Sequence, residues 1–66
     1  MRPDFKGAPI DYAKSLKAQE LKKVIADCKK GPYDEFTDRC RICFEHYLKK
    51  EYEQAAWWSK HAELAR

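Results

Sequence analysis

The chain has 66 residues, a net charge of +3 and a charged fraction of 38%. A chain of this length forms one domain at most and buries only about 60% of its unfolded surface, so help from a partner subunit or a metal is expected. The mild positive charge is far below that of a dedicated nucleic-acid-binding arm. Aromatic residues make up 14% of the chain, which predicts that some rings lie at a surface that meets another molecule.

The cysteine count and the absence of long apolar runs indicate in which cellular compartment the protein is located. Three cysteines are an odd number, so they cannot all pair within one chain. No secretory h-region follows Met1, and no run approaches the ~20 apolar residues of a membrane span. These features predict free thiols, a reducing compartment, a cytoplasmic location and no association with a membrane.

The first half of the chain predicts an arm followed by a helix. Residues 1–10 contain two prolines and a glycine, which favour an extended or partly disordered arm, and residues 11–66 are predicted to form a single small helical domain. A first helix is predicted over residues 11–30, with Asp11 as its N-cap. One face of that helix is apolar and holds Ile10, Ala13, Leu21, Val24, Ile25 and Cys28. The sequence Lys29-Lys30-Gly31-Pro32 ends it.

The segment from Phe36 to Leu64 contains both tryptophans, both histidines and two cysteines, but no Gly and no Pro. Nothing in it therefore forbids helix from end to end. Two interpretations are open after the N-cap residue Asp34. One is a single helix over residues 34–64, which would need a partner chain. The other is a turn at residues 49–51 that separates helices over 34–49 and 52–64. Either way, the predicted fold class is all-α, with two or three helices.

The residues around this turn, Tyr47-Leu48-Lys49-Lys50-Glu51-Tyr52-Glu53-Gln54-Ala55, resemble the turn of a tetratricopeptide repeat. That family places small residues and aromatic residues at set positions of two helices. The matching positions here are Cys43, Tyr47, Tyr52, Ala55 and Ala62. The turn has no Gly, no Pro follows the second helix, and residues 11–30 hold no second copy. The resemblance implies a helical hairpin that binds a peptide or protein, rather than a repeat protein.

Four residues of the types that zinc prefers follow the spacing C-x11-C-x2-C-x2-H, namely Cys28, Cys40, Cys43 and His46. Cys40 and Cys43 lie one helical turn apart, but His46 lies about 240° round the helix from Cys40. The four converge only if the helix is broken there. The alternative is that buried free cysteines act as small hydrophobic residues in a helix core. We therefore predict no bound metal and no cofactor.

The sequence gives little support for catalysis. Glu45 with His46, and Glu53 with His61, pair an acid with a base, but neither pair comes with a nucleophile or a Gly-rich loop. The prediction is that the protein is not an enzyme.

Nucleic-acid binding is the main alternative function. Basic residues lie near the predicted turns, and helix, turn and helix describe a helix-turn-helix in outline. The basic set is Lys22, Lys23, Lys29, Lys30, Arg39 and Arg41. Acidic residues such as Asp38 and Glu45 are interleaved on the candidate recognition helix, where they would face phosphates unfavourably.

The two adjacent tryptophans predict an interaction surface, because neighbouring helical residues point about 100° apart. Trp58 falls in line with Leu48, Ala55 and Ala62, the predicted core stripe. Trp57 instead lines up with His61 and Leu64 on an otherwise polar face. These residues, together with Tyr52, are the predicted partner-binding set. A broad core that partly covers both rings is the alternative.

These features together predict a small non-catalytic helical protein that acts by protein–protein interaction, as an adaptor or regulator. Its partners are itself, as a homodimer, a larger protein, or both. The size and the lack of an enzyme motif are similar to those of the small accessory proteins of temperate phages.

Overall fold

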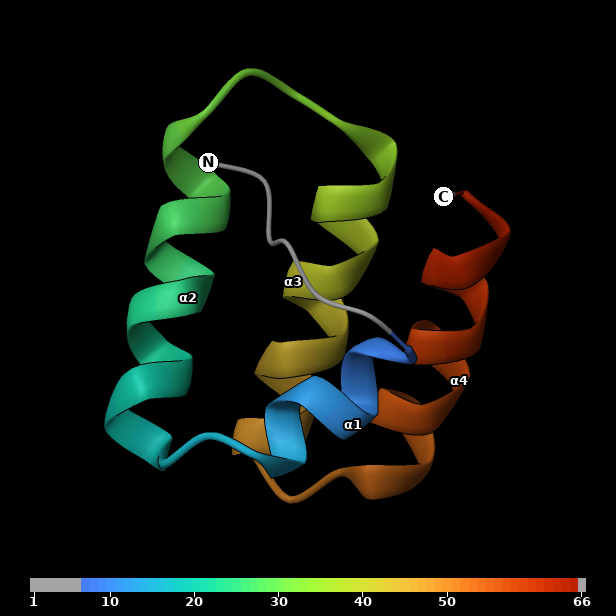
Figure 1. The fold of residues 1–66 in the computed structure, drawn as a ribbon. Helices are drawn as coiled ribbons and strands as arrows, with labels where there is room; N and C mark the ends of the chain where they lie inside the picture. Colours follow the sequence, from blue (N-terminus) through green and yellow to red (C-terminus); the bar gives the residue numbers. More distant parts are fainter. Residues whose placement is uncertain (1–6, 66) are drawn as a thin grey trace.

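The computed structural model describes residues 7–65, in which four helices and their turns contain no strand. The helices are α1 (Pro9–Lys14), α2 (Ala18–Lys30), α3 (Glu35–Leu48) and α4 (Tyr52–Leu64). Figure 1 shows α3 in the middle, where it packs against each of the other three helices, and α4 also contacts α1. The predicted all-α class is confirmed. Residues 1–6 of the predicted arm lie outside the described residues.

The segment predicted as one helix, residues 11–30, forms two helices instead, and the first of them begins inside the predicted arm. Pro9 stands at the first turn of α1, where its missing N–H is not needed. After α1, the Ser15 hydroxyl donates to the Tyr12 carbonyl at 2.6 Å. The Glu20 carboxylate then accepts from the Lys17 N–H at 3.0 Å, which satisfies a backbone donor where α2 begins. This break lets α1 cross α3 and α4 while α2 packs mainly on α3 (Figure 1).

A tight turn at residues 49–51 separates α3 from α4 and excludes the single long helix. Lys50 has a φ of 64°, in the left-handed region. The Glu51 N–H donates to the His46 carbonyl at 2.9 Å, and the Lys50 N–H donates to the Tyr47 carbonyl at 3.0 Å. These two bonds form a Schellman motif, in which the left-handed position is usually Gly. The predicted helices over 34–49 and 52–64 are therefore present, although the turn lacks the usual residue.

The core is small and is filled mainly from α3. Its buried hydrophobic residues are Ala13, Leu21, Ile25, Phe36, Cys40, Cys43, Phe44, Ala55 and Ala62. Partly buried side chains that pack against them include Leu16, Val24, Leu48 and Trp58. The predicted core stripe through Leu48, Ala55, Trp58 and Ala62 is therefore the stripe that faces inward.

The inward face of α4 consists of small residues. Ala55, Ser59 and Ala62 are all buried. The Ser59 hydroxyl accepts a hydrogen bond from the Ile10 N–H at 3.0 Å, a contact between residues 49 positions apart. That N–H belongs to the first turn of α1, where backbone donors lack partners within the helix. The Ser59 side chain thus links α4 to the first turn of α1.

Replacing Lys50 with Gly is expected to stabilise the protein. A non-Gly residue in the left-handed region destabilises the folded state by about 1–2 kcal/mol, and Gly removes this strain. Gly also makes the unfolded chain more flexible, but this destabilises the fold by a smaller amount. We expect Lys50→Gly to raise the free energy of unfolding by roughly 0.5–1 kcal/mol in urea titrations. Lys49→Gly is the matched control, because Lys49 has a φ of −82° and should lose stability. If both variants lost the same amount of unfolding free energy, the backbone of Lys50 would not be in the left-handed region.

Removing the Ser59 hydroxyl is expected to loosen α1. Ser59→Ala leaves the partly buried Ile10 N–H without its acceptor, which should cost about 1 kcal/mol of unfolding free energy. The Ile10 amide should also exchange with solvent faster. Ser15→Ala is the control, because its hydroxyl is exposed and bonds within its own helix end. An unchanged Ile10 exchange rate in Ser59→Ala would contradict this role.

Candidate interaction surface

The side of α4 that faces away from the core carries two large apolar side chains. Trp57 is 59% exposed and Leu64 is 78% exposed. With His61 they occupy positions i, i+4 and i+7, which lie on one side of a helix. Small buried residues fill the opposite side, so the bulk of the apolar surface of α4 points outward. We call Trp57, His61 and Leu64 the outer face of α4.

The rings of this face are packed against each other. His61 stacks on Trp57, with ring centroids 4.7 Å apart and planes 25° apart. Trp58 meets Trp57 edge to face at 5.0 Å and 83°, and it meets His61 at 5.5 Å and 77°. Trp58 in turn packs against the core. The exposed indole of Trp57 is therefore held in place by a cluster rooted in the fold, which lowers the entropy that binding would cost.

Arg39 fixes the backbone beneath this cluster. Its Nη1 donates to the His61 carbonyl at 3.0 Å, one of the last four carbonyls of α4, which lack partners within the helix. The same guanidinium also pairs with Glu35. Arg39 was predicted as part of a nucleic-acid surface, and this role was not predictable from the sequence, because the acceptor lies 22 residues away in the chain.

Tyr52 does not join the outer face of α4. It is 53% exposed but lies about 140° round the helix from Trp57. Its ring packs edge-on against Tyr47, with centroids 5.3 Å apart. The structure therefore brings three of the four predicted partner-binding residues together and places Tyr52 beside the α3–α4 turn.

The four candidate zinc ligands are dispersed. Cys40 and Cys43 are fully buried, and Cys28 is half-buried at the end of α2. The Cys43 thiol donates to the Ala55 carbonyl at 3.1 Å, so it faces α4 rather than the first helices. His46 pairs with Glu51, 2.8 Å from Nδ1 to Oε1. Within residues 7–65, no three His, Cys, Asp or Glu side chains are grouped so that they could hold a metal.

Burial changes the acidity of two thiols. It raises the pKa of Cys43 from 9.0 to about 12, because a thiolate in an apolar core loses its hydration. Burial also raises the pKa of Cys28. Thiols with raised pKa values are poor nucleophiles at neutral pH, so their chemistry is that of small core residues.

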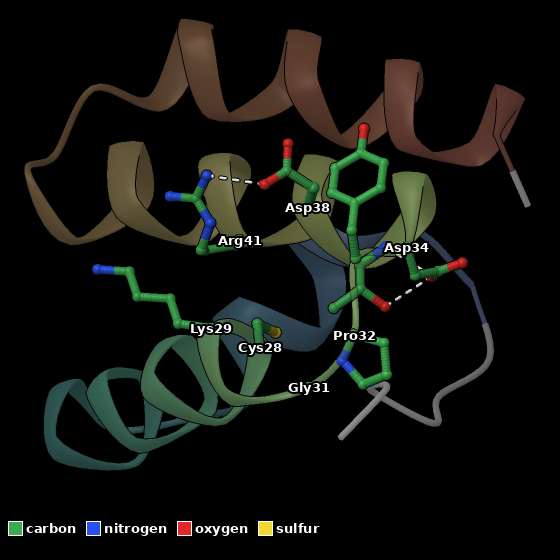
Figure 2. Close-up of a pocket in the computed structure, with 9 residues that line it drawn as sticks. Cys28, Lys29, Gly31, Pro32, Asp34, Asp38 and Arg41 are labelled. Carbon is green, nitrogen blue, oxygen red and sulfur yellow. Dashed lines mark hydrogen bonds and ion pairs between the residues drawn. The ribbon is translucent and has the colours of Figure 1, made fainter.

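A pocket of about 340 Å³ lies where the end of α2 faces the start of α3. Figure 2 shows Cys28 and Lys29 on one side of it and Asp38 and Arg41 on the other. Arg41 donates to Asp38 and to Glu45, each at 2.9 Å, and the Asp38 bond raises the pKa of the guanidinium. The Gly31-Pro32 turn that lines this pocket is evident in the sequence, but the pocket itself is not, because its other walls come from separate helices.

The basic residues of the nucleic-acid alternative do not form one free surface. Arg39 and Arg41 are engaged by carboxylates or a carbonyl on their own hairpin. Lys29 lies 3.4 Å from Glu45. Lys22, Lys23 and Lys30 are exposed on α2. Both arginines are thus partly neutralised where a recognition helix would need them.

Comparisons with known protein families, with curated proteins and with solved structures found no match for this chain. The resemblance to a tetratricopeptide repeat therefore remains a prediction. Of what it implies, the structure contains the helical hairpin, formed by α3 and α4. Among residues 7–65, no helix has both the length and the apolar character needed to cross a membrane.

The raised pKa of Cys43 predicts a loss of stability at high pH. Between pH 9 and about 12 the unfolded chain releases this proton while the folded chain keeps it, so the free energy of unfolding falls as pH rises. Below pH 9 both states hold the proton and the effect is absent. Cys43→Ala lacks this contribution, so its stability deficit relative to the wild type should shrink from pH 8 to pH 10.5 in urea titrations. Cys28→Ala, with its smaller shift, should show less change, and a constant deficit for Cys43→Ala would contradict the assignment.

Proposed function

We propose that this chain is a small non-catalytic interaction protein, an adaptor or regulator that acts in the cytoplasm by binding another protein through the outer face of α4. The observation that carries the proposal is the 59% exposure of Trp57 in a ring cluster rooted in the core. Tryptophan is among the residues most enriched at the energetic centres of protein interfaces, where its loss costs ~2 kcal/mol or more.

The position of α4 in the fold supports the proposal. A surface helix ordinarily has one apolar side toward the core and one polar side toward water. α4 instead has buried small residues on one side and Trp57 and Leu64 on the other. An apolar character on two sides is typical of a helix packed between two layers. α3 and α1 supply the inner layer, and a bound protein would supply the outer one.

A protein partner is favoured over a nucleic acid by the same contacts. The outer face of α4 offers rings and an aliphatic side chain, whereas phosphate binding relies on available cations. Arg39 and Arg41, the two arginines of the candidate recognition helix, are held by groups of the same chain. Helix-turn-helix binding therefore has less support than a protein interface. A small accessory role of the kind found in temperate phages fits an interaction protein of this size.

Site-specific photocrosslinking tests the surface. Benzoylphenylalanine in place of Trp57, introduced in the native host, should give a covalent protein adduct on irradiation. The matched control is the same substitution at Tyr33, which is 80% exposed in the α2–α3 turn. An adduct from position 57 and none from position 33 would support the proposal. No adduct from position 57, or equal adducts from both, would contradict it.

A further inference from the structure

We propose that the partner on the outer face of α4 is a second copy of this chain, with the two α4 helices antiparallel and the twofold axis at Trp57. The inference rests on the proposed function, because both use the same face. It adds the identity of the partner, the orientation of the two helices and the residues that align them.

The charges beside Trp57 fit this orientation. Glu53 lies four residues before Trp57 and Lys60 lies three residues after it, which places both within about 60° of the indole around the helix. Both are exposed, and within the described part of the chain neither has an ion-pair partner. The surface beside the outer face of α4 is thus negative near the beginning of the helix, at Glu53, and positive towards its end, at Lys60.

An antiparallel pair brings opposite charges together. Reversing one helix about Trp57 places Glu53 of each chain near Lys60 of the other, so two equivalent ion pairs form. A parallel pair would place Glu53 against Glu53 and Lys60 against Lys60. The face is therefore complementary to itself under a twofold rotation. Self-complementarity is the property that a homodimer interface requires, and it favours a second copy over an unrelated protein.

The apolar residues fit the same arrangement. Trp57 lies on the axis and packs against the same ring of the second chain, with His61 stacked beside it. Leu64 lies seven residues beyond the axis, so it reaches the α3–α4 turn of the second chain. One contact thus covers Trp57 and Leu64, two of the four exposed large hydrophobic residues of the described chain, while Tyr33 and Tyr52 lie outside it.

Charge reversal measured by sedimentation velocity tests the inference. We expect the wild-type chain to form dimers at about 100 µM, where a micromolar dissociation constant suffices. Glu53→Lys and Lys60→Glu each replace two attractions with two repulsions and should weaken dimerisation by about tenfold. The double variant restores the opposite charges and should regain wild-type affinity. Added salt should reduce the differences.

Two controls change the charge elsewhere by the same amount. Glu63→Lys lies about 120° round α4 from Trp57 and outside the outer face, and Lys23→Glu lies on α2. Neither should change dimerisation. Trp57→Glu should leave the helical circular dichroism intact and give monomers.

Three results would overturn the inference: a monomeric wild-type chain, single variants that dimerise as well as the wild type, or a double variant no better than the singles. If the wild-type chain is monomeric but benzoylphenylalanine at position 57 crosslinks a different protein, the second copy is the wrong partner and the proposed function stands. A monomer that gives no adduct from position 57 would overturn the proposed function as well.

Discussion

The close contact between α3 and α4 is the constraint on which the rest of the structure depends. It is possible because α4 presents Ala55, Ser59 and Ala62 to the core, so the two backbones approach without large side chains between them. The approach is close enough for the Cys43 thiol to reach the Ala55 carbonyl at 3.1 Å. Larger residues on this side of α4 would separate the helices and break that hydrogen bond.

The same constraint explains why α4 is apolar on its outer side. A helix that gives only small residues to the core contributes little apolar area to folding. Its bulky residues then lie at the rim, as Trp58 does, or outside, as Trp57 and Leu64 do. The Arg39 bond to the His61 carbonyl holds the end of α4 in this orientation. The close packing of α4 on α3 and the exposed apolar residues of the outer face therefore have one cause. α4 has its small residues on the inner side and its large residues on the outer side.

Local signals predicted much of this fold. Gly31-Pro32 ends α2, Asp34 caps α3 through the Thr37 N–H at 3.0 Å, and the stripe through Ala55 and Ala62 is buried. The 100° rule also separated Trp57 from Trp58 correctly, since only Trp58 packs on the core.

Features that depend on distant partners were not predictable in the same way. The break at residues 15–17 carries no Gly or Pro, and the left-handed Lys50 occupies a position where Gly is usual. The roles of Arg39 and Ser59 depend on residues 22 and 49 positions away. The dispersal of Cys28, Cys40, Cys43 and His46 follows from an intact α3, which the spacing alone left open.

The Ile10–Ser59 hydrogen bond also sets the order in which a growing chain can fold. α1 is made before α4, yet its acceptor on α4 lies 49 residues later in the sequence. The hairpin of α3 and α4 relies on near neighbours in the chain and can form early, because short loops close at little entropic cost. α1 has no complete docking site until almost all of α4 has left the ribosome. Among the four described helices, the first to be synthesised is therefore the last to reach its native position.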